Sequence, residues 1–587
     1  MINMRKLTLF TLGLALVFLA FSVSTYARPV EQGQNMDELT ALAAYAPAES
    51  AIFAAIRTDE GYFDTLDALV ANISAGLDPE LVDFLGVQDF RTFFDEMVLA
   101  DVNFAEDVRP WLGNTAGFYV PGLDSLLFGG GDLPFVLALG VNDQGGADAF
   151  VTDMLAVDLA SGDMTRTTDE DGIIYYEPAL RFMPGAVITE DALIFGLLGR
   201  NFSDVILPGA DAPSLLSAPN FTQTQNAMPR PDYNFLLYVD PSSILELVAV
   251  FLPLLGPELG VDLPPELLDP VALSATIGQL AVGGVIVEDR AMVLDITSTS
   301  EALRGLFAPP VDVDLLARVP DDAALLIQGS GLGDIVRTVV DSAALLDELL
   351  LLVEPGALDE IAPFRFGQLS TFFRLSFEGM SGLPYHMTMD ALSSDFITFV
   401  TAKTEVGDDF AEVIAGTGTV LRSTNTAVTD VLFERISEDV LSIFNIATLD
   451  DGVLNIPFGE IFNDFDDMRF SITTDDDLIF IGDEATVAAL RDADGAKLTD
   501  SASYAFESGL FLPNASTVWY INTAPALMAL SQLLTMDMVR ETMTEDDLMM
   551  AMQAVNALSA LETSAITVNV TDDAFSLRAT LTFAVAD

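Results

Sequence analysis

Closely spaced aspartates are the residues of this chain best suited to hold a metal ion. Calcium takes several oxygen ligands that converge at a tight turn, which a glycine often makes possible. The segments 463–467, 475–477 and 492–495 carry such acids, although none has the full loop spacing with a closing glutamate. We keep calcium as the one candidate cofactor, against the alternative that each segment is an acidic hairpin tip facing solvent. The candidate ligands are Asp464, Asp466, Asp475, Asp477, Asp492 and Asp494.

Residues for catalysis are scarce. There is no cysteine, so thiol chemistry and thiolate metal sites are excluded. A Ser-His-Asp triad would have to use His386, the only histidine, which we expect to be a structural residue in a strand-like stretch. No Gly-x-Ser-x-Gly segment supplies a serine, and the glycine run 129–131 lacks the lysine of a phosphate-binding loop. Carboxylate pairs are expected by chance among so many acids, so we predict no enzyme and no catalytic residues.

The acidic excess limits the kinds of partner. The chain has 89 acidic residues against 24 basic ones, a formal charge of −65, and the acids are spread along its length. This charge argues against nucleic acid and anionic membrane surfaces, because both need basic patches. Two explanations stay open: adaptation to a salty medium whose ions screen the repulsion, and binding of divalent cations. With 51% hydrophobic residues, the chain still has the composition of a folded protein.

Residues 1–27 have the pattern of a secretory signal peptide. Arg5 and Lys6 form its positive region, residues 7–23 its apolar region, and Ala27 ends a small-residue cleavage site. An uncleaved membrane anchor is the alternative. We expect an extracytoplasmic location, secreted or in a periplasm-like or cell-surface space, with residues 28–38 as a mobile leader. No other segment is long and apolar enough to span a bilayer, so no integral membrane segment is expected after cleavage.

The chain contains an internal repeat. Residues 188–195 read Ile-Thr-Glu-Asp-Ala-Leu-Ile-Phe, and residues 472–480 repeat its Ile-Thr and Asp-Leu-Ile-Phe parts. Residues 214–240 and 497–522 share a series of leucine, aromatic and proline landmarks. Corresponding landmarks lie roughly 280 to 285 positions apart, which predicts a duplicated module. We place the two homologous modules at residues 39–306 and 311–587, divided at a pair of prolines.

Each module is expected to belong to the α+β class. A proline cue precedes a short apolar strand and a helix near residues 51–56, and the cue recurs before 234–239, 323–328 and 517–521. Between these cues lie hairpin patterns, with turns such as the Asp-Gly at residues 171–172. Strands joined by hairpins form antiparallel sheets. We therefore predict two modules, each a mainly antiparallel sheet with helices packed on one face.

The repeated landmarks resemble a known family. The first set is Leu215, Phe221, Pro231, Tyr238, Val239 and Asp240, and the second is Leu498, Tyr504, Pro513, Tyr520, Ile521 and Asn522. Together with the export signal, this box resembles a bacterial exported family catalogued as domain of unknown function 3352. The resemblance implies an extracytoplasmic location and brings no activity or residue roles. Asn522 stands where the first box has Asp240, which argues against a shared catalytic acid.

Two apolar stretches bear on function. Residues 244–268 are rich in leucine and residues 528–552 in methionine, whose side chain adapts to irregular apolar partners. They could form a deformable wall for a lipid-like ligand or a partner helix, or they could pack on a sheet as ordinary helices. We predict an exported, non-enzymatic protein with a binding or surface-associated structural role. A carrier or sensor of an apolar ligand is the alternative, and a carboxylate-based hydrolase has the least support.

Adaptation to salt can be tested by thermal unfolding. If counterions relieve the repulsion among the acids, the unfolding temperature should rise markedly from low to molar sodium chloride. Circular dichroism at increasing salt concentration measures it. A flat response would remove the salt-adaptation explanation.

Overall fold

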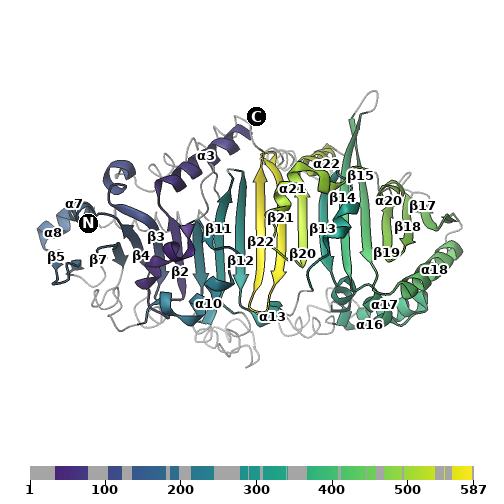
Figure 1. Ribbon diagram of the computed structural model, residues 1–587, viewed down its shortest axis with the longest axis horizontal. Helices are drawn as coiled ribbons and strands as arrows, with labels where there is room; N and C mark the ends of the chain where they lie inside the picture. The colour runs from purple at the N-terminus through teal and green to yellow at the C-terminus, as the bar shows by residue number, and fades with distance from the viewer. Residues whose placement is uncertain are drawn as a thin grey trace. The chain divides into compact units, whose positions relative to one another are not determined.

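The chain forms two compact units, each built around an antiparallel sheet. The computed structural model describes residues 34–76, 103–121, 135–179, 185–196, 213–242, 278–288, 290–304, 309–338, 340–341, 366–406, 411–443, 446–457, 469–491, 495–535, 548, 555 and 558–584. The first unit comprises Met1–Leu255, Pro264–Gly305 and Thr571–Asp587, and the second Gly256–Leu263 and Leu306–Val570. Helices accompany both sheets (Figure 1), so the predicted α+β class is confirmed.

The sheet of the first unit is antiparallel at every described pairing. Its strands lie side by side in the order β5 (Met164–Thr168), β6 (Ile174–Pro178), β7 (Gly185–Ile188), β8 (Ala192–Gly196), β4 (Val136–Val141), β3 (Leu112–Val120), β2 (Ile52–Arg57), β10 (Phe235–Val239), β11 (Leu280–Val287), β12 (Ala291–Ser298) and β22 (Phe575–Phe583). A small ribbon, β1 (Gln34–Asn35) with β9 (Asp232–Tyr233), lies in the same unit.

The sheet of the second unit has the same order of connections. Its strands are β16 (Thr448–Asp450), β17 (Val453–Pro457), β18 (Arg469–Asp475), β19 (Leu478–Asp483), β15 (Ala411–Arg422), β14 (Asp395–Val406), β13 (Ala323–Ser330), β20 (Thr517–Asn522) and β21 (Leu561–Val570). Taken in order from the start of each list, the strands of the second unit correspond to those of the first, so that β16 corresponds to β5 and β21 to β11. The second unit has no described strands that correspond to β12 and β22. The four strands predicted after the proline cues are confirmed as β2, β10, β13 and β20.

The tight turns follow from local chemistry. Gly172 has φ 82° between β5 and β6, and Gly452 has φ 77° between β16 and β17, a left-handed conformation that glycine adopts without steric cost. Glu288 and Asp476 also have positive φ at the turns before β12 and β19. The hairpins predicted at these acidic turns are confirmed.

The helices of the two units have the following bounds. The first unit has α2 (Met36–Leu39), α3 (Glu60–Gly76), α7 (Gln144–Met154), α8 (Ala156–Ser161), α10 (Pro219–Ala227), α13 (Glu301–Arg304) and a π-helix (Phe104–Val108). The second has α16 (Phe366–Ser381), α17 (Tyr385–Ala391), α18 (Thr426–Ile443), α20 (Glu484–Arg491), α21 (Ala502–Ser508) and α22 (Thr523–Thr535). Short 3₁₀ helices span Ala41–Ala44, Leu215–Ser217, Val313–Arg318 and Leu498–Asp500.

Helices cover both faces of the first sheet, so the prediction that they pack on one face is wrong. Tyr62 and Leu66 of α3 belong to a buried core with Ile56 of β2. Phe221 of α10 instead meets Phe53 of the same strand edge-on, with ring centroids 5.7 Å apart. Residues 53 and 56 point to opposite faces because side chains alternate along a strand. The central strands are apolar on both faces, and each face therefore requires cover.

The repeated box residues form matching aromatic cores. Phe221 packs edge-on against Tyr238 at 4.9 Å, and Tyr504 packs edge-on against Tyr520 at 5.1 Å. All four rings are at most 4% exposed. Asp240 accepts hydrogen bonds from the backbone N–H and the hydroxyl of Ser242, at 3.0 and 2.6 Å. The box thus fixes a short helix on the sheet and ends a strand, which are structural roles.

The last described strand belongs to the first unit, whereas the sequence placed it in the second module. β22 runs beside β12 (Figure 1), with Arg578 opposite Asp295. Arg578 donates to both oxygens of Asp295, from Nε at 2.6 Å and from Nη2 at 2.8 Å, and Tyr233 donates to Oδ2 at 2.7 Å. Asp295 and Tyr233 are fully buried and Arg578 is 5% exposed. Burial, with the neighbouring carboxylate, raises the pKa of Tyr233, so its hydroxyl remains a donor.

Removing one partner of this buried ion pair should destabilise the first unit strongly. Asp295→Ala leaves the Arg578 guanidinium buried without its carboxylate, and we expect a loss of about 3–5 kcal/mol in the free energy of unfolding. Urea unfolding followed by circular dichroism measures it. The double variant Asp295→Leu/Arg578→Met should recover most of the loss, because two apolar side chains need no ionic partner. Glu438→Ala, which breaks the exposed Arg435–Glu438 pair, should cost about 1 kcal/mol or less. A comparable loss in that control would contradict the assignment.

Candidate functional site

The predicted calcium ligands are only partly within the described residues. Asp464, Asp466, Asp492 and Asp494 lie outside them. Asp475 and Asp477 are exposed at the tip of the β18–β19 hairpin, as the alternative reading expected. Asp477 lies 3.3 Å from Nε of Arg422, which also pairs with Asp312 and Asp395. In the ranges that the structure describes, no group of three or more Asp, Glu, His or Cys residues is placed to hold a metal ion.

His386 lies on a helix, so the prediction of a strand-like stretch is wrong. It follows Tyr385 at the start of α17 and is exposed. Pro384 directly precedes the helix, a position at which a fixed φ favours helix initiation. The neighbouring Tyr385 and Met389 are buried and attach α17, which leaves His386 on the solvent side.

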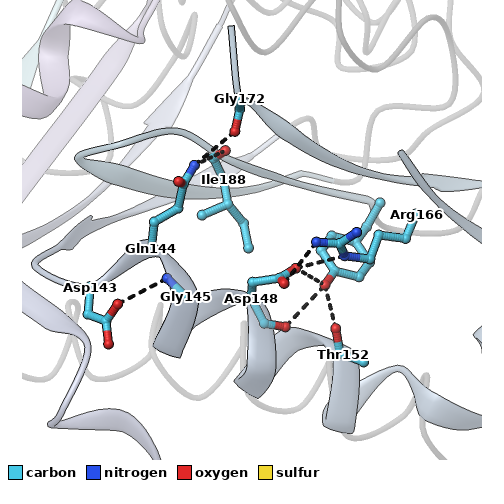
Figure 2. A network of polar contacts seen from close by, with 9 residues as sticks. Asp143, Gln144, Gly145, Asp148, Thr152, Arg166, Gly172 and Ile188 are labelled. Carbon is cyan, nitrogen blue, oxygen red and sulfur yellow. Dashed lines mark hydrogen bonds and ion pairs between the residues drawn. The ribbon is translucent and has the colours of Figure 1, made fainter. Parts of the chain in front are cut away.

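A polar network joins α7 to the β5–β6 hairpin of the first unit (Figure 2). Asp148 accepts from Arg166 Nε at 2.9 Å and Nη2 at 2.8 Å, and from the hydroxyl of Tyr176 at 2.6 Å. The Tyr176 hydroxyl also lies 2.7 Å from Oγ1 of Thr152, one turn further along the helix. At the start of α7, Gln144 donates to the carbonyl oxygens of Gly172 and Ile188 at 3.1 and 3.4 Å (Figure 2).

The charges of this network are already matched. Burial alone would raise the pKa of Asp148, but hydrogen bonds from Arg166 and Tyr176 outweigh it and hold that pKa below its usual range. Burial and the bond to Asp148 raise the pKa of Tyr176 to about 12, so the phenol stays protonated and donates. An ionised carboxylate paired with a guanidinium is a weak base. The network therefore positions α7 on the hairpin and offers no free acid or base for catalysis.

This network was not predicted from the sequence. Asp148 lies 18 positions from Arg166 and 28 from Tyr176, and these distances match no local helix or hairpin spacing. The β5–β6 hairpin was predicted, but the packing of α7 across it depends on tertiary contacts. The pattern that could indicate such a network is an arginine opposite a tyrosine in a predicted hairpin, here Arg166 and Tyr176, with an acid on the neighbouring helix.

The second unit has an apolar surface on one side of its sheet. Ile327, Trp519 and Ile566 are direct neighbours across β13, β20 and β21, and Leu325 lies opposite Ile521 in the next row. Trp519 is 50% exposed, Ile566 40% and Ile521 39%. We call the surface formed by Leu325, Ile327, Trp519, Ile521 and Ile566 the Trp519 face. It is unusual because large apolar side chains so close together are normally covered.

The reverse side of these strands is the core of the unit. Tyr520 and Leu326 are fully buried there, and Ala565 is 4% exposed. The period of two along each strand sends alternate residues to the core and to the Trp519 face. Both sides of these strands therefore carry apolar side chains, enclosed on one side and partly exposed on the other.

The first unit has an apolar row on β10 and β11, which correspond to β20 and β21, and the row continues on β12 and β22. Leu237, Val282, Ile296 and Leu577 lie opposite one another across β10, β11, β12 and β22, and all four are half-buried. The reverse side carries Asp295 and Arg578, which are enclosed. In both units, apolar side chains are left on one side of the corresponding strands.

The apolar stretches singled out in the sequence are mostly outside the described residues. Residues 244–268 lie outside them, as does most of 528–552. The part that is described belongs to α22, where Met528 is 42% and Leu530 38% exposed. α22 lies against β13, β14, β15, β20 and β21, and so contacts all three strands that carry the Trp519 face. The sequence analysis considered an apolar surface on the helices and did not predict the Trp519 face of the sheet. The alternation of side chains along a strand does not show which side of the sheet is left exposed.

The fold and the site define an α+β protein with large antiparallel sheets and an open apolar sheet face. The model of the family described as Protein of unknown function (DUF3352) matches residues 8–356, more than half of the chain. The chain belongs to this family. No curated protein and no solved structure matches it. Among the helices in the described ranges, none has the length and apolar character needed to cross a bilayer.

The structural role of Asp148 can be tested by pH-dependent unfolding. Because its pKa is lowered in the folded state, its ionised form stabilises the protein above the ordinary carboxyl value of about 4 and loses this effect as pH falls through the lower folded value. Asp148→Asn should reduce the free energy of unfolding by about 1–2 kcal/mol at pH 7, since both partners are partly exposed.

The difference from the native protein should shrink as the pH falls below about 4. Urea unfolding at several pH values measures it, and Asp153→Asn, an exposed change on the same helix, is the matched control. A difference that is independent of pH would show that the side chain acts through shape alone.

Proposed function

We propose that this chain is an exported, non-enzymatic binding protein whose Trp519 face holds an apolar, lipid-like ligand. The observation that carries the proposal is the half-exposed Trp519 between Ile327 and Ile566, in a row without a charged side chain. Ligand sites are commonly apolar with a few polar groups at the edge. Thr398 beside Ile327 and Ser564 beside Ile521 supply neutral hydroxyls at this edge.

The area of the face is sufficient for useful affinity. Trp519, Ile521 and Ile566 together expose about 250 Å² of side chain, and covering it at about 25 cal/mol per Å² is worth roughly 6 kcal/mol. The cost of immobilising the ligand reduces this gain. An acyl chain would retain a net attraction, whereas a polar substrate would find few hydrogen-bond partners on this surface.

We also infer that the two units descend from one duplicated module. Their strands follow one order of pairing, and both leave an apolar row on corresponding strands. Asp295 and Arg578 lie 283 positions apart, within the spacing of the sequence landmarks, and sit on strands that end corresponding hairpin patterns. A duplicated binding module supports a binding role, since the shared features are structural and apolar rather than catalytic.

An extracytoplasmic location supports the same function. The signal-like residues 1–27 would send the protein to a compartment where lipid-like molecules must be carried through water. The formal charge of −65 would keep a protein with open apolar surfaces dispersed.

Tryptophan fluorescence tests the proposal directly, because the chain has only two tryptophans and Trp111 is 2% exposed. A bromine-labelled fatty acid, used below its micelle concentration, should quench the emission of the native protein. Trp519→Phe should abolish this quenching, because only the buried Trp111 remains. Absence of quenching in the native protein, or equal quenching in Trp519→Phe, would refute the proposal.

A second variant measures affinity without removing the fluorophore. Ile566→Asp places a charge beside Trp519 and should weaken binding by about tenfold or more, which corresponds to about 1.4 kcal/mol. Val157→Asp alters another exposed apolar side chain, 58% exposed on α8 of the first unit, and should leave binding unchanged. Circular dichroism confirms that each variant is folded.

A further inference from the structure

Helix α16 of the second unit carries a ridge of exposed apolar side chains. Leu369, Phe372 and Leu375 lie three positions apart, so they follow one side of the helix. They are 45%, 70% and 65% exposed. We call these three side chains the α16 ridge. A side chain as large as Phe372 rarely projects this far into water unless another surface receives it.

The ridge is not the side by which α16 is attached. Phe373 and Phe377 both meet the ring of Tyr385 on α17 edge-on, at 6.3 and 6.0 Å. Arg374 lies over the same ring, with its guanidinium carbon 5.5 Å from the centroid. These contacts fix the orientation of α16 and leave the α16 ridge facing outward.

The ridge is free of negative charge, although the chain as a whole is strongly acidic. The first twelve residues of α16, Phe366–Phe377, contain no acid, whereas the chain has 89 acids among 587 residues. The only acid of the helix, Glu378, accepts a hydrogen bond from the backbone N–H of Tyr385 at 2.9 Å and is thereby directed toward α17. Arg374 is the one basic residue of the helix; its guanidinium lies over Tyr385 and pairs with Asp341 at 3.5 Å, on the side by which α16 is attached.

The area of the ridge favours a lipid surface over a second protein. Its three side chains, with Phe373, expose roughly 400 Å², about half of the 800 Å² per partner that a stable protein interface buries. Two copies of the chain would also repel each other, because each carries a formal charge of −65. An amphipathic helix, in contrast, binds a bilayer interface through a few inserted aromatic and leucine side chains.

We propose that the α16 ridge docks the protein on a neutral phospholipid surface by inserting Phe372, Leu369 and Leu375 among the headgroups. We specify a phospholipid without net charge because the negative charge of the protein repels anionic lipids. This inference goes beyond ligand binding at the Trp519 face and does not require it: one surface would contact the membrane, and the other would hold a single apolar molecule.

Co-flotation with phosphatidylcholine vesicles tests the docking surface on the full chain. The native protein should float with the vesicles, and binding should change less than twofold between low and molar salt, because insertion is apolar. Phe372→Asp/Leu375→Asp should reduce the bound fraction at least tenfold. Val157→Asp, a matched charge at an exposed apolar position elsewhere, should bind as the native protein does.

Each contrary outcome can be recognised. No flotation of the native protein, or equal flotation of the ridge variant, would overturn the proposal. Self-association of the native protein that the ridge variant abolishes, without vesicle binding, would identify a protein interface instead and would also overturn it. The ridge variant should keep the native unfolding temperature within about 2 °C, since both side chains are largely exposed. Its quenching by monomeric bromine-labelled fatty acid should be unchanged, which separates this test from that of the Trp519 face.

Discussion

The pairing of Asp295 with Arg578 fixes the register of β22 against β12, and with it the side to which each residue of β22 points. A shift of β22 by one residue would send every side chain of that strand to the other face. In the observed register, Leu577 lies opposite Ile296, and the ionic groups meet on the enclosed side. The shifted register would move the guanidinium to the half-buried side of the sheet and leave the buried Asp295 carboxylate without its partner, at a cost of several kcal/mol. The ion pair therefore selects a register as much as it contributes stability.

The second unit also buries a carboxylate against its sheet. Glu507 of α21 is fully buried and accepts from the hydroxyl of Thr563 on β21 at 2.8 Å. Beside it, Tyr504 and Tyr520 fill the position that Phe221 and Tyr238 fill in the first unit. In both cases a helix with a buried aromatic ring closes one face of the sheet. On the opposite face, α3 packs beside Ile56 in the first unit, and the Trp519 face lies on the sheet of the second.

Local features of the fold could be predicted from the sequence, and non-local ones could not. The β5–β6 hairpin was predicted because its turn depends on the adjacent Asp171 and Gly172. The strands after the proline cues were predicted for the same reason. The place of β22 was not, since its partner β12 lies 283 positions away at the ion pair. His386 was assigned to a strand-like stretch because a short apolar run does not distinguish a buried helix from a strand.

The acidic charge and the apolar surfaces can be understood together. Carboxylates near an apolar contact would have to lose their hydration when a partner covers them, and this cost disfavours binding. The Trp519 face is bordered by Thr398 and Ser564, and the outward part of α16 has no acid. Elsewhere the acids repel other copies of the chain and anionic molecules, both of which would otherwise compete for the open surfaces. A neutral lipid experiences no such repulsion, so the charge distribution itself selects the kind of partner that the apolar surfaces can accept.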